Sequence, residues 1–380
     1  MYCSTTNEVI NTDNIINNLN LKKSKFERPI PKSLIKIKPK TSFGILNAYT
    51  NSRIELGKSK SKNISQDHNI IKNILQLIEF TDLKELSRES AECIRNSLKY
   101  YPKNSKKYPE LKNLKGFELI EKNDKSLKPR DCISSTTIKG YIHKFSTFLS
   151  WAKNHHYIEE NVFYKLPTLE SKIIKKRFPF SDEQLNNIFN MPSYTSHKYL
   201  HPYYYWVPLL LRYSGARLNE ICQLREDDIK LLDGIQCIMI RENFDDQSVK
   251  NISSIRFIPI HHELIKNGFL SFVSTKKNKR LFPELPSVKG YYSNNASKWF
   301  SRCRAKLGLG KGFDAHSFRH TFINELKQKY VSKEIIECIV GHEHKSESFD
   351  IYSEQYNAKI LAPIINLISC SHTVSIKKYH

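Results

Sequence analysis

The sequence of 380 residues has no long apolar run and no apolar signal-peptide core. Its short apolar stretches, residues 206–211 and 360–367, fall below the roughly 18 residues that a spanning helix needs. Pro208 and Pro363 interrupt them. The start of the chain is dominated by Asn, Thr and Ser and then by lysines. These absences disfavour a membrane protein and an exported one, so we expect a cytoplasmic protein.

Paired cysteine motifs are also missing. The chain has eight cysteines but no CxxC pair and no regular spacing, which argues against a zinc ribbon or a redox motif. In a protein without an export signal, such cysteines are expected to be reduced thiols. No cluster of carboxylates or of Cys and His has the spacing of a metal site. We therefore predict neither a metal nor another cofactor.

Acidic residues are too few to balance the basic ones. Lys and Arg number 61 and Asp and Glu number 38, which leaves a formal charge of 61 − 38 = +23. Such a surplus favours a polyanionic partner, and nucleic acid comes before an anionic membrane. The glycine-rich or aromatic signatures of an RNA-binding module are missing, so DNA is the favoured nucleic acid.

The first part of the chain divides into a basic segment and a helical domain. Residues 1–65 are rich in Asn, Ser and Lys and contain three prolines, so we expect a flexible basic segment. Residues 66–172 carry helical apolar periods. The clearest helix is predicted between Thr136 and His155, with Thr136 or Thr137 as its cap.

A second domain is predicted over residues 178–365. It follows a basic connector, and Ser181-Asp182-Glu183-Gln184 has the pattern of a capping box that opens a helix. Residues 235–241 and 254–260 are predicted to be two strands within an otherwise helical domain. Residues 366–380 are predicted to be a tail or an edge strand. The fold class is therefore mainly α with a small β-sheet.

Three short motifs in the second domain carry the polar groups of interest. Ser214-Gly215-Ala216-Arg217 places an arginine after a glycine break, where a helix resumes. His316 and Arg319 are three residues apart and share one face of a helix. His342 follows Gly341, which is predicted to end a helix over residues 332–340, and Tyr352 lies ten positions further on (352 − 342 = 10).

Each of these residues alone has an ordinary structural explanation. Arg217 could form a surface salt bridge with Glu220, His342 could be a capping residue, and Tyr352 could be a packed aromatic. In combination they suit phosphate chemistry. Guanidinium groups grip two phosphate oxygens and keep their protons near neutral pH. An imidazole exchanges a proton near pH 7, and a phenol can attack phosphorus.

In this order and spacing, the motifs resemble those of the tyrosine recombinase (phage integrase) family. The resemblance spans roughly residues 68–365. It implies a helical core-binding domain and a catalytic domain that clamp DNA like a C. It also implies a site-specific recombinase or integrase of a phage or other mobile element, which cleaves and rejoins DNA through a 3′-phosphotyrosine and needs no metal.

The resemblance also assigns roles to single residues. Tyr352 is the implied nucleophile, Arg217 and Arg319 hold the phosphate, and His316 and His342 take part in proton transfer or phosphate contact. Lys250, before a strand, matches the family's hairpin lysine that protonates the leaving oxygen. Two alternates lie close by in the sequence: His344 for the histidine and Tyr356, one helical turn on, for the nucleophile. Five basic residues are predicted to contact DNA: Lys139, Lys144, Lys175, Lys176 and Arg177.

The expected partners are specific double-stranded DNA sites, three further copies of the chain in a tetramer, and an accessory directionality factor. The segment after Leu361 is a candidate for exchange between neighbouring copies. Two other functions remain open. One is a non-catalytic DNA-binding regulator on the same scaffold, and the other is a DNA-relaxing enzyme like the type IB topoisomerases, which would act without a preferred site.

Overall fold

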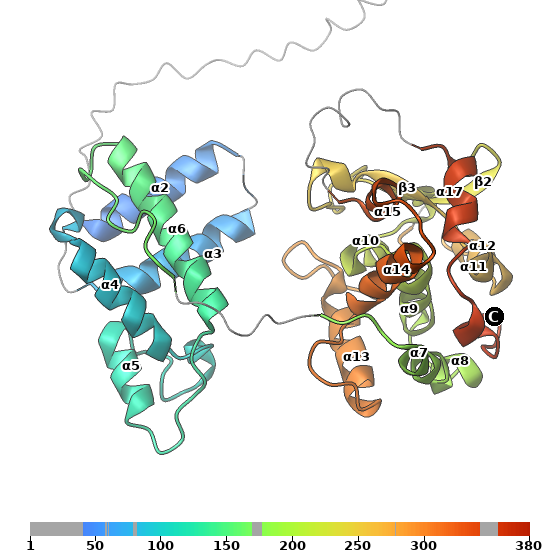
Figure 1. Ribbon diagram of the computed structural model, residues 1–380, viewed down its shortest axis with the longest axis horizontal. Helices are drawn as coiled ribbons and strands as arrows, with labels where there is room; N and C mark the ends of the chain where they lie inside the picture. The colour runs from blue at the N-terminus through green and yellow to red at the C-terminus, as the bar shows by residue number, and fades with distance from the viewer. Residues whose placement is uncertain are drawn as a thin grey trace, which may run out of the picture. The chain divides into compact units, whose positions relative to one another are not determined.

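The computed structural model describes residues 41–57, 59, 61–78, 82–168, 177–277, 279–342 and 356–380. The chain divides into two compact units, residues 1–171 and residues 172–380 (Figure 1). Each unit has its own apolar core. Within the ranges just given, no helix is long and apolar enough to cross a membrane.

The first unit is a bundle of helices around α6. Its α-helices are α2 (Ser42–Glu55), α3 (Ser61–Leu75), α4 (Arg88–Ser97), α5 (Gly116–Asp124) and α6 (Ser135–Asn154). Short 3₁₀ turns lie at η1 (Leu83–Glu85), η2 (Leu98–Tyr100) and η3 (Ser105–Lys107). The helix predicted from Thr136 is present, but its cap is Ser134, whose hydroxyl accepts the Thr137 N–H. The predicted cap was wrong by two or three residues.

The expectation that residues 1–65 form a flexible segment is wrong for the part that the structure describes. Helix α2 buries Ile45, Leu46 and Tyr49 in the same core as Phe148 of α6, and α3 begins at Ser61. The polar composition of residues 1–65 predicted flexibility, but α2 needs only a few apolar side chains to pack, because they are spaced so that they share one face. The remainder, residues 1–40, lies outside the described residues.

The second unit is a helical domain built around a small sheet. Its α-helices are α7 (Asp182–Phe189), α8 (Pro192–Thr195), α9 (Pro202–Ser214), α10 (Leu218–Cys222), α11 (His262–Lys266), α12 (Phe269–Ser274), α13 (Ser293–Lys306), α14 (Ser317–Gln328), α15 (Lys333–Val340) and α17 (Ala358–Ile365). Its 3₁₀ turns are η4 (Glu226–Asp228), η5 (Ile252–Ser254) and η6 (Ser371–Thr373). The capping box predicted at Ser181 and Gln184 is confirmed.

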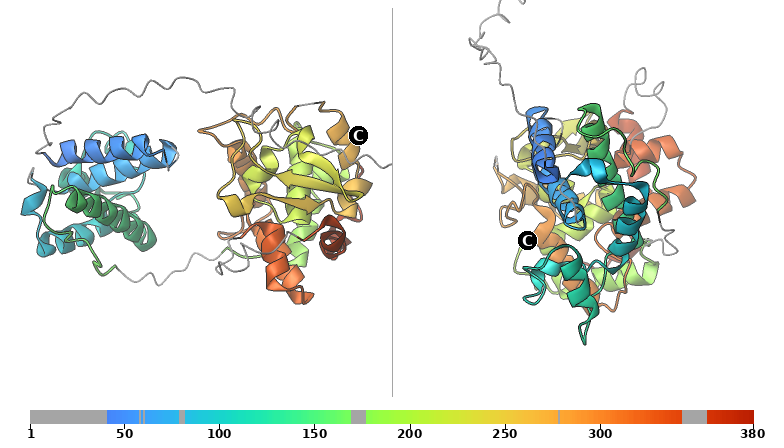
Figure 2. Two further views of the ribbon diagram at one scale, coloured as in Figure 1. Left: turned by 90° about the horizontal axis from the view of Figure 1, so that it is seen from above. Right: turned by 90° about the vertical axis from the view of Figure 1, so that its left-hand side faces the viewer.

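The sheet has three antiparallel strands in the order β1-β2-β3, seen as yellow arrows in the left view of Figure 2. They are β1 (Ile229–Leu232), β2 (Ile235–Ile240) and β3 (Arg256–Pro259). The prediction had two strands and missed β1. A two-residue turn joins β1 to β2 at Asp233 and Gly234, both with positive φ, and such an Asp-Gly pair favours a hairpin.

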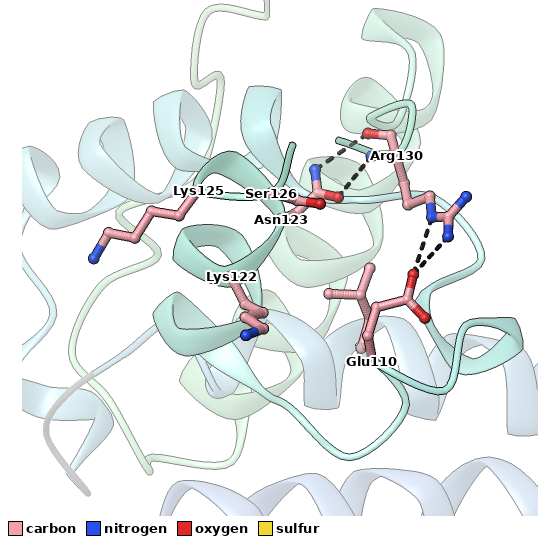
Figure 3. A pocket seen from close by; sticks show the side chains of 7 residues that line it. Glu110, Lys122, Asn123, Lys125, Ser126 and Arg130 are labelled. Atoms are coloured by element: carbon pink, nitrogen blue, oxygen red, sulfur yellow. Dashed lines mark hydrogen bonds and ion pairs between the residues drawn. The ribbon is translucent and has the colours of Figure 1, made fainter. Parts of the chain in front are cut away.

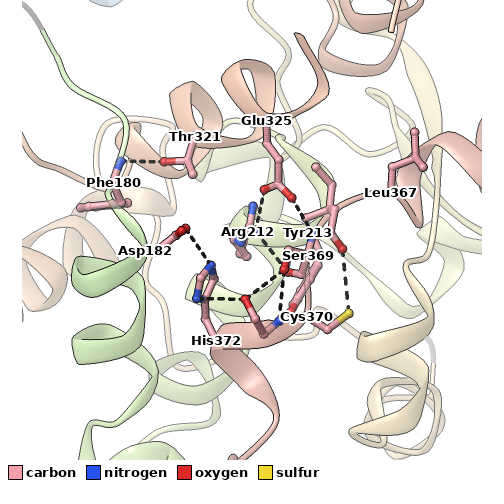
Figure 4. Close-up of polar contacts among 12 residues, drawn as sticks. Phe180, Asp182, Arg212, Tyr213, Thr321, Glu325, Leu367, Ser369, Cys370 and His372 are labelled. Atoms are coloured by element: carbon pink, nitrogen blue, oxygen red, sulfur yellow. Dashed lines mark hydrogen bonds and ion pairs between the residues drawn. The ribbon is translucent and has the colours of Figure 1, made fainter. Parts of the chain in front are cut away.

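Helices α9 and α14 pack together in the centre of the second unit. Arg212 of α9 is 1% exposed, and its Nη2 donates to Glu325 Oε2 of α14 at 2.7 Å. The same Nη2 lies 3.1 Å from the carbonyl oxygen of Ser369, whose N–H donates to Glu325 Oε1 at 2.6 Å (Figure 4). The ion pair thus fixes both helices to the segment that follows α17.

Residues 366–380 are neither a loose tail nor an edge strand, so that prediction was wrong. The Tyr213 hydroxyl lies 2.6 Å from Thr373 Oγ1. The Lys377 N–H donates to the Tyr194 carbonyl at 2.9 Å, and the Tyr379 N–H donates to Asn267 at 3.2 Å. The segment docks on the second unit because Ile368 and Ile376 bury apolar surface there.

The packing of α2 predicts a stability effect that a flexible segment would not show. Leu46→Ala should lower the free energy of unfolding by about 2–4 kcal/mol, because Leu46 is 1% exposed in the first core. Ile54→Ala on the same helix is the matched control, since Ile54 is 58% exposed and should cost less than about 1 kcal/mol. Chemical denaturation of both variants checks this. If both variants lower the free energy of unfolding by the same small amount, the packing of α2 is contradicted.

Candidate active site

The site begins at the break between α9 and α10. Gly215 ends α9 with a φ of +62°, a conformation that side chains disfavour. A Cβ at this position would also lie 2.5 Å from the ring of Phe322 on α14. The close approach of α14 therefore requires glycine, and the turn places Arg217 at the start of α10.

Three arginines converge on the C-terminal end of α15. Consecutive carbonyl oxygens accept from them: Ile339 from Arg256 Nε at 2.6 Å, Val340 from Arg319 Nη1 at 2.6 Å, and Gly341 from Arg217 Nη2 at 2.8 Å. The last carbonyls of a helix lack partners within the helix and carry its partial negative charge. They are therefore suitable anchors for guanidinium groups.

Gly341 makes this convergence possible. It ends α15 with a φ of +67°, and a Cβ there would lie 2.8 Å from Arg256 Nη1. The helix predicted to end at this glycine is confirmed. The N–H groups of Gly341 and His342 both donate to the Glu337 carbonyl, which closes the helix end.

Glu220 is the counter-ion of the cluster. Its Oε1 accepts from Arg217 Nη1 at 2.7 Å and its Oε2 from Arg256 Nη2 at 2.9 Å. Burial acts to raise the pKa of this carboxyl group, but Arg256 and Arg217 hold it below its usual range. The Arg217–Glu220 pair that could explain Arg217 alone is therefore present, but its carboxylate is buried and its guanidinium is half-buried. One carboxylate faces three guanidinium groups, Arg319 included, so the cluster keeps a surplus of positive charge.

Arg319 has unused hydrogen-bonding capacity. Its side chain is fully buried, and Nη1 donates to the carbonyl oxygens of Gly215 and Val340. Its Nη2 has no hydrogen-bond partner among the residues that the structure describes. Burial, then the charges of Arg217 and Arg256, lower the pKa of Arg319 to about 9, which leaves it charged at neutral pH. A buried donor without a partner is costly, and an anion bound there would satisfy it.

His316 lies one turn before Arg319, at the N-cap of α14. Its backbone N–H donates to Asp314 Oδ1 at 2.7 Å. Burial, then the positive charges of His320 and Arg319, lower the pKa of His316 to about 4. The imidazole is therefore neutral near pH 7, and it can accept a proton.

His342 follows the Gly341 turn directly and is exposed. Partial burial of its ring, and then Arg319 and Arg217, lower its pKa. His342 lies beside the arginine cluster because the carbonyl of the preceding Gly341 accepts from Arg217 Nη2. Tyr352 and the alternate His344 lie outside the described residues. The alternate Tyr356 is described, is 36% exposed and precedes the cap of α17.

Lys250 is exposed on the connection between β2 and β3. The connection reaches the arginine cluster at Ser254, whose Oγ accepts from Arg217 Nη1 at 3.0 Å. The β2–β3 connection therefore contacts Arg217, the arginine of the first motif. The structure also brings Arg217, Arg319 and the turn before His342 together.

The residues predicted to contact DNA differ in their surroundings. Lys139 is exposed on α6, whereas Lys144 on the same helix pairs with Asp67. Arg177 pairs with Asp314 at 2.9 Å, at the edge of the site. Lys175 and Lys176 lie outside the described residues. Of the three described residues, only Lys139 has a charge without an assigned counter-ion.

Sequence reasoning missed Arg256 and gave Glu220 only a surface role. The signal for Arg256 was a single charged residue inside the apolar run of a predicted strand, Ile255-Arg256-Phe257-Ile258. Such a residue must find partners when the strand is buried. Those partners are the Ile339 carbonyl, the Ser254 carbonyl and Glu220.

Two other features of the described residues were candidates for function. His261, His262 and Cys370 could together offer metal ligands, but His261 Nδ1 already accepts the Glu263 N–H and its Nε2 lies 3.1 Å from the Ile368 carbonyl. The first unit has a pocket of about 270 Å³ with Lys122 and Lys125 at its rim and a Glu110–Arg130 ion pair at 2.6 Å (Figure 3). Neither feature contains the groups predicted for phosphate chemistry.

Comparison with known proteins agrees with this geometry. Residues 180–359 match the phage integrase family. The chain is 24% identical over 270 residues to a protein of Aquifex aeolicus named "Probable integrase/recombinase", a match that covers 62% of this chain and 82% of that one. It is 23% identical over 264 residues to a tyrosine recombinase of Thermosipho africanus, covering 66% and 86%. Residues 180–359 are therefore similar in sequence to the phage integrase family, and the chain is similar to curated tyrosine recombinases.

Solved structures share the fold at low sequence identity. A lambda integrase tetramer bound to a Holliday junction aligns with a TM-score of 0.56 at 16% identity, covering 88% of this chain and 87% of that one. The Tn1549 transposon integrase in complex with circular intermediate DNA aligns with a TM-score of 0.57 at 16% identity, covering 84% and 97%. The predicted fold class, mainly α with a small β-sheet, is confirmed.

The lowered pKa of His316 predicts a pH dependence of stability. The unfolded histidine takes up a proton as the pH falls through about 6.5, whereas the folded one does not until about 4. Its contribution to stability is therefore complete above about 6.5 and is lost as the pH falls toward 4. Between about pH 7 and pH 5 we expect a loss of about 1 kcal/mol, because solvent screening of a partly buried ring roughly halves the full effect.

Chemical denaturation of the wild type and of His316→Gln at both pH values measures this difference. The variant should lose less stability on acidification than the wild type by that amount. Equal losses in the two proteins would show that His316 does not titrate abnormally.

Proposed function

We propose that this protein cleaves and rejoins specific DNA sites, with Tyr352 as the nucleophile and Arg217 and Arg319 as the phosphate clamp. The observation that carries the proposal is Nη2 of the buried Arg319, which finds no hydrogen-bond partner within the described parts of the chain. A second arginine lies beside it, held on the next carbonyl at the end of α15. A phosphodiester oxygen would satisfy that donor, and both guanidinium groups would neutralise charge that develops in the transition state.

In the proposed step, the Tyr352 oxygen attacks phosphorus and forms a 3′-phosphotyrosine while the bond to the 5′-oxygen breaks. His316 receives the phenolic proton, and its lowered pKa leaves the ring unprotonated near pH 7 and so able to take that role. Lys250 protonates the leaving 5′-oxygen, and His342 donates a hydrogen bond to the phosphate. The same groups act in reverse when a 5′-hydroxyl attacks the phosphotyrosine and restores the DNA backbone.

Three features support double-stranded DNA as the partner. The chain has a formal charge of +23, the arginine cluster keeps a surplus of positive charge, and structural neighbours have been determined with DNA. The lambda integrase neighbour is a tetramer on a Holliday junction, which supports the proposal that this chain also assembles as a tetramer on paired sites. The helical unit would then complete a C-shaped clamp around DNA, with Lys139 and the 175–177 segment on the backbone.

The biological setting follows from the same chemistry. An enzyme with this activity fits a phage or other mobile element and acts where the chromosome lies, in the cytoplasm. An accessory directionality factor and exchange of the segment after Leu361 are further parts of the proposal. In the structure that segment docks on its own catalytic unit, so exchange would require it to leave that position.

A covalent-adduct assay tests the nucleophile. Binding sites are first selected with the full-length protein from a pool of random-sequence duplexes, and the enriched duplex is nicked so that cleavage releases a short fragment. The wild type should form an adduct that resists SDS. Tyr352→Phe should reduce the adduct by about 1,000-fold or more, because the attacking oxygen is gone.

Tyr356→Phe is the matched control, since it removes a phenol four residues away and should keep the adduct. An adduct that persists in Tyr352→Phe and disappears in Tyr356→Phe would move the nucleophile to Tyr356. Selective binding without an adduct in the wild type would instead favour the non-catalytic regulator, and relaxation of plasmids that lack the selected site would favour the topoisomerase-like enzyme.

A further inference from the structure

The connection between β2 and β3 has an unusual apolar tip. Ile252, the first residue of η5, is 86% exposed, and Ile255 at the other end of this turn is 45% exposed. Lys250 is exposed two residues before Ile252. A large aliphatic side chain almost fully in water, next to a catalytic site, has no role in packing its own unit.

The connection is anchored firmly before this tip. The Asp246 carboxylate accepts two hydrogen bonds from Arg225 Nη2, at 3.0 and 2.9 Å, and one from the Tyr292 hydroxyl at 2.7 Å. The Ser248 N–H donates to the side chain of Gln223, the C-cap of α10, at 3.0 Å. The first half of the connection is thus fixed at the C-terminal end of α10 and to the residues before η4 and α13.

The connection is anchored equally well after the tip. Ser254 Oγ accepts from Arg217 Nη1 at 3.0 Å, and its carbonyl accepts from Arg256 Nη1 at 2.7 Å. The Ile255 N–H donates to the Ile252 carbonyl at 2.9 Å, which closes the 3₁₀ turn. Ile252 is therefore held in place by its backbone, two residues from a serine that bonds a phosphate-clamp arginine.

We propose that Ile252 is an apolar DNA contact that packs into the minor groove beside the scissile phosphate. The tip is continuous with the arginine cluster through Ser254, and Lys250 beside it is exposed. The chain as a whole carries a formal charge of +23, which attracts the DNA backbone, so we take DNA as the occupant of the tip. Aliphatic side chains that enter the minor groove press between base steps and unstack them. In this way Ile252 positions the phosphate and favours sites that contain an easily unstacked step.

This inference rests on the proposed function, and one experiment separates the two. The probe is the duplex enriched from the random pool, with 2-aminopurine placed next to the scissile phosphate that adduct mapping locates. All proteins carry Tyr352→Phe so that cleavage does not contribute to the signal. Binding by the parent should raise the 2-aminopurine fluorescence, because the base loses a stacking neighbour.

Ile252→Ala in this background should bind the duplex about 10-fold more weakly, because most of the buried aliphatic surface is lost, and should abolish the fluorescence increase. Ile252→Leu should stay within about 2-fold of the parent because it keeps that surface. Leu200→Ala is the matched control. Leu200 is 78% exposed but lies before α9, at the helix end opposite Arg217, so both signals should stay unchanged.

Unchanged affinity and fluorescence in Ile252→Ala would overturn the inference while leaving the proposed function intact. Loss of assembly at high protein concentration, with normal binding of one copy, would also overturn it and make a second copy of the chain the occupant of the tip. If the parent selects no duplex at all, the proposed function itself fails.

Discussion

The second unit depends on one interaction, the attachment of three arginines to three successive carbonyl oxygens at the end of α15. Arg256 comes from a strand, Arg319 from α14 and Arg217 from the start of α10. Each guanidinium would repel the others in an apolar interior. The helix end supplies partial negative charge, and Glu220 supplies one full negative charge, so the cations can stay together.

The same interaction explains why the cluster remains ready for an anion. One carboxylate does not neutralise three guanidinium groups, and Nη2 of Arg319 keeps its hydrogen-bonding capacity. Behind the site, the Arg212–Glu325 ion pair ties α9 to α14 and both helices to Ser369. Arg217 and Arg319 are therefore held at helices that are tied to their neighbours, as a preorganised phosphate site requires.

The sequence predicted the parts of this arrangement that local rules govern. Gly215 and Gly341 break helices where expected, and the Ser181 capping box opens α7. What it did not predict depends on contacts between distant segments. The burial of Leu46, the docking of residues 366–380 and the role of Arg256 arise only when those segments pack. Composition alone made two of these segments resemble tails, because a few well-placed apolar side chains suffice to dock them.

The central claim is that Arg217 and Arg319 hold the same phosphate. Diffraction from crystals soaked with tungstate, a phosphate analogue with a strong anomalous signal, tests it most directly. We predict an anomalous peak within hydrogen-bonding distance of Nη2 of Arg319 and of the Arg217 guanidinium, and its loss in Arg319→Ala. A peak that contacts only one of the two arginines, or no peak beside the end of α15, would contradict the account.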